Sequence, residues 1–193
     1  MAQSSEKASS ITSTGSRTRS LVFVALSVAI IAVSAWITIP LGPVPFTLQM
    51  FAIAFAIFVL TPRQCMATIV AYLALGAIGI PVFSGMRGGF GMFAGPTGGF
   101  LWGYLIAVPL ASMLLTLLRK RGFDNWGTYL VAGIVFTAIS YVCGWAQYMT
   151  IAQVSPLASF TVTVAPFIVV DVVKIVCAAF VARAVMRAVP NRV

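Results

Sequence analysis

The chain has 193 residues, of which 61% are hydrophobic and only 8% are charged, and its formal net charge is +9. A water-soluble domain has roughly 45–50% apolar and about 25% charged residues. The composition therefore excludes a water-soluble domain and predicts an integral membrane protein. The chain has no His and only three acidic residues, which argues against an enzyme, a metal site or a bound cofactor. The twelve basic residues form no single patch, so we expect no binding to nucleic acid.

The chain divides into a polar tail and a long apolar region. Residues 1–20 are rich in Ser and Thr and contain almost no side chain to bury, which predicts a disordered cytoplasmic tail. From there, residues 21–190 are expected to form one substrate-binding domain. Its apolar stretches end at Pro, Gly or basic residues and predict an all-α fold of six transmembrane helices. These stretches cover residues 21–39, 46–60, 65–80, 98–118, 129–151 and 165–182.

The positions of the basic residues predict the orientation of the helices, because Lys and Arg concentrate in cytoplasmic loops. With the N-terminus inside, ten of the twelve basic residues fall on the cytoplasmic side. Arg87 alone falls outside, and Lys174 falls within the sixth span. We therefore expect both termini in the cytoplasm.

The segment between the third and fourth predicted spans is unusually rich in glycine. Residues 79–99 hold eight of the sixteen glycines, together with apolar side chains such as Phe83 and Phe93. Such a segment favours a structured loop that packs into the outer mouth of the bundle. The alternative is a floppy external connector, which would leave these apolar side chains in water.

Three charged residues interrupt the apolar pattern. Asp171 and Lys174 lie three positions apart in the last span, on one face of a helix that we expect to begin at Pro166. Ionisable residues inside a membrane usually face a cavity, although such a pair can also merely fix helix packing. Arg87 either anchors a carboxylate through its guanidinium or lies among lipid headgroups.

Together these features predict a cavity, open to the outside, that suits a small amphipathic organic anion. The sequence has no phosphate-binding loop motif, so energy for active transport would come from another polypeptide. The candidate ligand-binding residues combine the charged groups with nearby hydroxyl, amide and aromatic side chains. They are Phe46, Thr47, Gln49, Phe83, Ser84, Arg87, Phe90, Tyr104, Asp171 and Lys174.

Four strings in this order resemble the BioY family, the biotin-binding S components of energy-coupling factor (ECF) transporters. They are GPVPFTLQ at 42–49, LGAIGIPVFSG at 75–85, GPTGGFLWGY at 95–104 and PFIVVDVVK at 166–174. The resemblance implies six helices in the cytoplasmic (inner) membrane of a prokaryote, and biotin uptake. It also implies partnership with a transmembrane coupling protein and with ATP-binding-cassette (ABC) ATPases, besides the membrane lipid that surrounds the chain.

The resemblance also implies roles for particular residues. Asp171 would accept a hydrogen bond from the ureido ring of biotin, and Lys174 would donate one. Arg87 matches a carboxylate-binding arginine, whereas Ser84 and its neighbour lack the amide that some relatives have there. Ala25 and Ala29 on the first helix would face the coupling protein. The alternatives are an S component for another small vitamin and a membrane assembly protein that transports nothing.

Overall fold

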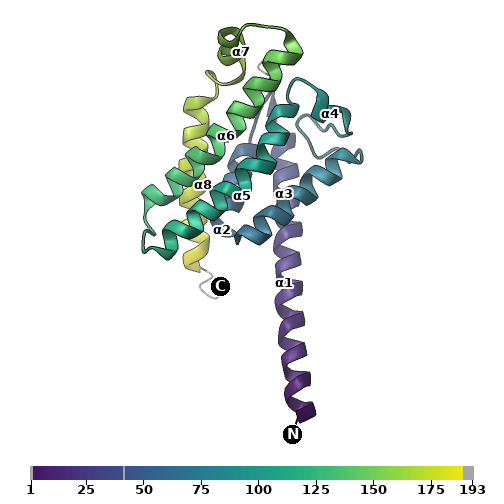
Figure 1. Ribbon diagram of the computed structural model, residues 1–193, viewed down its shortest axis with the longest axis vertical. Helices are drawn as coiled ribbons and strands as arrows, with labels where there is room; N and C mark the ends of the chain where they lie inside the picture. Colours follow the sequence, from purple (N-terminus) through teal and green to yellow (C-terminus); the bar gives the residue numbers. More distant parts are fainter. Residues whose placement is uncertain (1, 41, 189–193) are drawn as a thin grey trace.

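The protein is mostly helical in the computed structural model, which describes residues 2–40 and 42–188, with side chains from residue 17 onward. Its helices pack side by side into one bundle, and the N-terminal part of α1 extends beyond it (Figure 1). The elements are α1 (Ala2–Trp36), β1 (Thr38–Ile39), β2 (Phe46–Thr47), α2 (Gln49–Val59), α3 (Pro62–Ala77), α4 (Gly91–Ala94), α5 (Gly98–Lys120), α6 (Trp126–Ala152), α7 (Pro156–Thr163) and α8 (Ile168–Ala188).

The described helices include several that are suited to a membrane. Three of them are long and apolar enough to cross it: α1 from Arg17 to Trp36, α5 and α6. The pair α7 and α8, bent by 43° at its break, adds a fourth if it is one span. At 11 and 16 residues, α2 and α3 are shorter than a simple crossing requires. Each predicted span overlaps a helix, but the number of six crossings stays a prediction.

The N-terminal helix includes residues for which the composition predicts a disordered tail. The backbone of α1 is helical from Ala2, and the disordered cytoplasmic tail at residues 1–20 stays a prediction. Extending an existing helix costs far less than starting one, so an apolar helix that begins near residue 21 can propagate into a polar segment. This extension is the part of α1 that leaves the bundle in Figure 1.

Two short helices and a strand pair were not predicted. Ser155 caps α7 by accepting a hydrogen bond from the Ala158 N–H, and Pro156 occupies its first turn, where proline is tolerated. A turn at residues 164–167 separates α7 from the last helix, so α8 begins at Ile168 rather than at the expected Pro166. The antiparallel pair of β1 and β2 brings Thr47 opposite Thr38, just before α2.

Small residues allow α5 and α6 to approach closely. A Cβ atom at Gly103 would lie 2.9 Å from the Cα of Ser140, and one at Gly99 would overlap the backbone of Cys143. Ala107 continues the same four-residue spacing and is fully buried. The spacing of small residues along α5 therefore determines how tightly these two helices pack, as in other membrane bundles.

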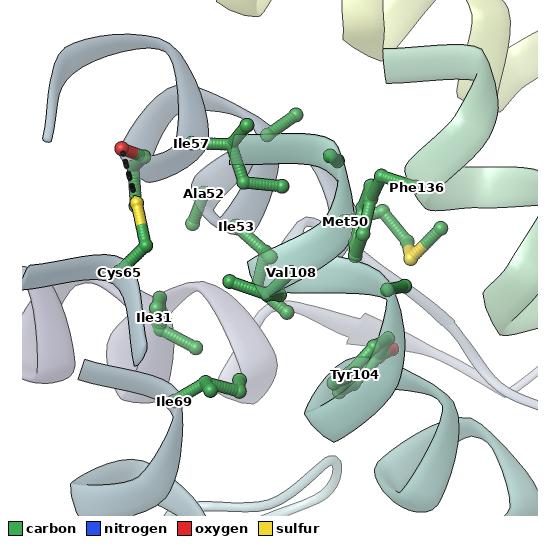
Figure 2. Packing of buried hydrophobic residues seen from close by; sticks show 14 of the residues in the cluster. Ile31, Met50, Ala52, Ile53, Ile57, Cys65, Ile69, Tyr104, Val108 and Phe136 are labelled. Carbon is green, nitrogen blue, oxygen red and sulfur yellow. Dashed lines mark hydrogen bonds between the residues drawn. The ribbon is translucent and has the colours of Figure 1, made fainter. Parts of the chain in front are cut away.

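Aliphatic side chains from four helices meet in the core. Figure 2 shows Ile31 of α1, Ile53 of α2, Ile69 of α3 and Val108 of α5 facing one another, and all four are almost completely buried. Tyr104, one turn before Val108, is buried at the edge of this cluster. The core thus fixes the positions of α2 and α5, which form part of the cavity wall described below.

The close approach of α5 and α6 predicts that added volume at Gly103 destabilises the bundle. Gly103→Val should lower the free energy of unfolding by about 2 kcal/mol, because overpacking typically costs about 1–3 kcal/mol. Thermal unfolding in detergent measures the effect. Ala138→Val on the exposed face of α6 is the matched control and should change little. Equal effects of the two substitutions would contradict this packing model.

Candidate functional site

A cavity opens between α2, α5, α6, the α7–α8 break and the glycine-rich segment. Its volume is about 650 Å³, including the open space at its mouth. Most of the wall is apolar or aromatic, with a few polar groups. The lining residues are Val44, Pro45, Thr47, Gln49, Met50, Phe83, Ser84, Met92, Thr97, Phe100, Leu101, Tyr104, Tyr141, Thr163, Phe167, Asp171 and Lys174.

The charged pair lies in the cavity wall at the start of α8. Asp171 and Lys174 are only 3% and 7% exposed, and Lys174 Nζ lies 2.6 Å from Asp171 Oδ1. Asp171 occupies the first turn of α8, where the partial positive charge of the helix N-terminus favours a carboxylate. The two opposite charges therefore neutralise each other, and the N-terminus of α8 further stabilises the Asp171 carboxylate.

The residues around the pair satisfy most of its remaining hydrogen-bonding capacity. Lys174 Nζ donates to the Thr47 carbonyl at 2.8 Å and lies 3.8 Å from the centre of the Phe46 ring. The Tyr141 hydroxyl donates to Asp171 Oδ2 at 2.6 Å. The strand pair and α6 thus hold the two charges in one orientation, which reduces the reorganisation needed when a ligand binds.

The glycine-rich segment packs onto α3 through aromatic side chains. The Phe83 ring occupies the space beside Gly76, where any Cβ would overlap it. It also makes edge-to-face contacts with Tyr72 and Phe93, at centroid distances of 5.5 and 5.7 Å. Ser84 follows Phe83 in the cavity wall, and its buried hydroxyl has no hydrogen-bond partner among the described residues. This segment therefore offers the cavity an aromatic surface and an unpaired hydroxyl.

Most of the candidate residues lie together, but three of the ten, Phe46, Arg87 and Phe90, lie outside the lining. Arg87 is exposed, and Phe90 is 68% exposed and stacks on Phe93. A tight turn, with positive φ at Gly85 and Met86, explains the position of Arg87, because it reverses the chain immediately after Ser84. Phe46 contributes indirectly, through its contact with Lys174. The other seven candidates line the cavity: Thr47, Gln49, Phe83, Ser84, Tyr104, Asp171 and Lys174.

Several lining residues were missed by the sequence analysis. Thr97, Phe100 and Leu101 precede Tyr104 at helical spacing and share its face of α5, so this periodicity could have found them. Tyr141 carries no such signal, because it lies in a largely apolar helix and is 30 residues away from Asp171 in the sequence. Its role depends on how α6 packs against α8.

Ala25 and Ala29 lie away from this cavity, on α1. Both are exposed, whereas Val28 between them is buried against the bundle. No other described part of the chain therefore covers this face of α1. Small exposed residues four apart permit close approach of another helix.

The buried pair predicts different stabilities for single and double substitutions. Lys174→Met should lower the free energy of unfolding by about 3–5 kcal/mol, because it leaves the Asp171 carboxylate buried without its cation. The double variant Asp171→Leu and Lys174→Met removes both charges and should be clearly more stable than the single variant. Thermal unfolding of ligand-free protein tests this. A double variant no more stable than Lys174→Met would contradict the ion-pair account.

Comparison with known proteins gives a consistent result. The BioY family model matches residues 4–191. The biotin transporter BioY of Thermotoga maritima is 35% identical over 165 residues, which cover 85% of this chain and 94% of that protein. A probable biotin transporter BioY of Pyrococcus horikoshii is 40% identical over 167 residues, covering 86% and 95%.

A solved structure is similar over nearly the same length. It is the S-component for biotin from an ECF-type ABC transporter, with a TM-score of 0.83 and 27% sequence identity, covering 89% of this chain and 92% of that one. The resemblance seen in the four sequence strings is thereby confirmed. This chain is a multi-pass membrane protein that belongs to the BioY family.

Proposed function

We propose that this protein binds biotin and takes it up across the membrane as the substrate-specific component of an ECF-type ABC transporter. The observation that carries the proposal is the buried Asp171–Lys174 pair in the wall of a cavity, in a member of the BioY family. Relatives named as biotin transporters, and the solved S-component for biotin, support the choice of ligand.

The chemistry of the cavity matches that of biotin. The ureido ring of biotin has two N–H donors and one carbonyl acceptor, and the rest of its bicyclic ring is apolar. Asp171 supplies acceptor oxygens and Lys174 a donor, so the pair can bind both kinds of group. Phe83, Phe100 and Phe167 supply an aromatic surface for the apolar part. On binding, the ureido group would thus replace its hydrogen bonds to water with hydrogen bonds to Asp171 and Lys174, which are already held in position.

The carboxylate of biotin needs a separate partner. Arg87 is exposed, but its backbone pairs with Phe83, whose side chain lines the cavity. A long arginine side chain at this turn can reach the cavity mouth, where its guanidinium would bind a carboxylate. Phe90 lies on the same segment and would cover the ligand there. We therefore retain both residues as ligand contacts at the mouth.

The proposal includes a partner complex and an orientation in the membrane. The exposed Ala25 and Ala29 would contact the transmembrane coupling protein, and ABC ATPases would supply the energy. Residues 21–190 would form the substrate-binding domain and cross the inner membrane of a prokaryote six times, with both termini in the cytoplasm and the glycine-rich loop outside. Exposed apolar side chains on α5 and α8, such as Leu117 and Phe180, would contact lipid.

Replacing the carboxylate tests its contact with the ligand. Asp171→Asn keeps the size of the side chain but removes its charge, so the free energy of biotin binding should weaken by about 1.5–3 kcal/mol. Titration of purified protein with labelled biotin measures this. Asp124→Asn is the matched control, because Asp124 is exposed between α5 and α6 and should leave affinity unchanged. Wild-type affinity in Asp171→Asn would contradict the assigned contact.

The role of Arg87 is tested with a ligand that lacks the carboxylate charge. Arg87→Gln should weaken biotin binding markedly but leave binding of an uncharged biotin amide nearly unchanged. The two ligands and two proteins form a double-mutant cycle that isolates the coupling. Arg63→Gln, at the exposed start of α3, is the control. A coupling energy of zero would remove Arg87 from the site and place it among the lipid headgroups.

A further inference from the structure

A chain of hydrogen bonds connects the cavity to the glycine-rich segment. Gln49 begins α2, is only 4% exposed and lines the cavity. Its Nε2 lies 3.0 Å from the Tyr72 hydroxyl, which in turn lies 3.0 Å from the Val82 carbonyl. Tyr72 is fully buried in α3 and is not itself a lining residue.

The chemistry of these groups fixes the orientation of the Gln49 amide. A backbone carbonyl only accepts, so the Tyr72 hydroxyl must use its one hydrogen to donate to Val82. The hydroxyl oxygen can then only accept, and the group that donates to it must be the NH₂ of Gln49. The opposite amide orientation would put two oxygens together without a hydrogen between them. Tyr72 thus holds the Gln49 amide in one of the two orientations that it could otherwise adopt.

The orientation determines what Gln49 offers to a ligand. With Nε2 held by Tyr72, the carboxamide oxygen Oε1 receives no hydrogen bond from the described residues. Donation from Nε2 also polarises the amide and strengthens Oε1 as an acceptor. In a mostly apolar cavity such an acceptor favours a ligand with an N–H or O–H donor and penalises one without it.

We propose that Gln49 is a specificity residue whose Oε1 accepts a hydrogen bond from a ureido N–H, and that Tyr72 is the positioning residue that orients it. This inference rests on the proposed function, because it takes biotin as the ligand. It adds a second acceptor to the carboxylate of Asp171, so that each of the two N–H groups of the ureido ring has its own partner. Lys174 remains the donor to the ring carbonyl.

A double-mutant cycle tests the positioning role of Tyr72. Gln49→Met removes the amide at similar length and should weaken biotin binding about tenfold, the change expected for one hydrogen bond. Tyr72→Phe keeps the ring contact with Phe83 and should weaken binding about threefold to tenfold. In the Gln49→Met background, Tyr72→Phe should cause no further loss, because Tyr72 acts through Gln49.

The alternative role for Tyr72 is purely structural, since its hydroxyl also holds the Val82 carbonyl of the glycine-rich segment. In that case Tyr72→Phe would lower affinity by the same factor with and without Gln49. Such additivity overturns the inference. Thermal unfolding of each variant without ligand checks that the fold is intact.

A second measurement keeps the inference testable if Tyr72→Phe does not fold. Two analogues of biotin, each methylated on one ureido nitrogen, are titrated against the parent protein and Gln49→Met. One analogue should bind the parent at least tenfold more weakly than biotin, and most of this difference should vanish in Gln49→Met. An unchanged difference for both analogues would overturn the inference. Failure of the parent protein to bind biotin would instead overturn the proposed function.

Discussion

The ion pair between Asp171 and Lys174 is the interaction on which the rest of the site depends. A charge in the apolar part of a membrane protein is costly unless it is paired and hydrogen-bonded, and these two groups are both. Their partners come from the β1–β2 pair and from α6, so satisfying the pair requires three separate parts of the chain to be in place. The same requirement creates a polar spot of fixed geometry in an otherwise apolar cavity.

The surrounding bundle holds this geometry by two kinds of packing. Small residues let α5 and α6 approach closely, and each of these helices contributes a tyrosine, Tyr104 or Tyr141, to the cavity wall. Aromatic contacts attach the glycine-rich segment to α3, with Phe83 seated against Gly76. Helix α8 thus presents the charged pair, while the glycine-rich segment, held on α3, contributes Phe83 and Ser84 to the cavity wall.

The sequence predicted those features that interrupt a clear pattern. Asp171 and Lys174 stand out in an apolar helix, and the glycines of residues 79–99 exclude a regular spanning helix there. Tyr72 and Tyr141 could not be found in this way, because a tyrosine in an apolar helix is usual and its partner is decided by tertiary packing. The same holds for α7, whose cap and proline are short local signals within a segment that composition alone describes as apolar. Arg87 was singled out by its charge, but the turn that directs it outward depends on backbone conformation.

The central claim is that the buried pair recognises the ureido ring of biotin, and an experimental structure with bound biotin tests it most directly. The account predicts the ureido ring in this cavity, with its N–H and carbonyl groups within hydrogen-bond distance, about 2.7–3.2 Å, of the pair. A structure in which biotin lies elsewhere, or binds here with the ureido ring turned away from Asp171 and Lys174, would contradict the account.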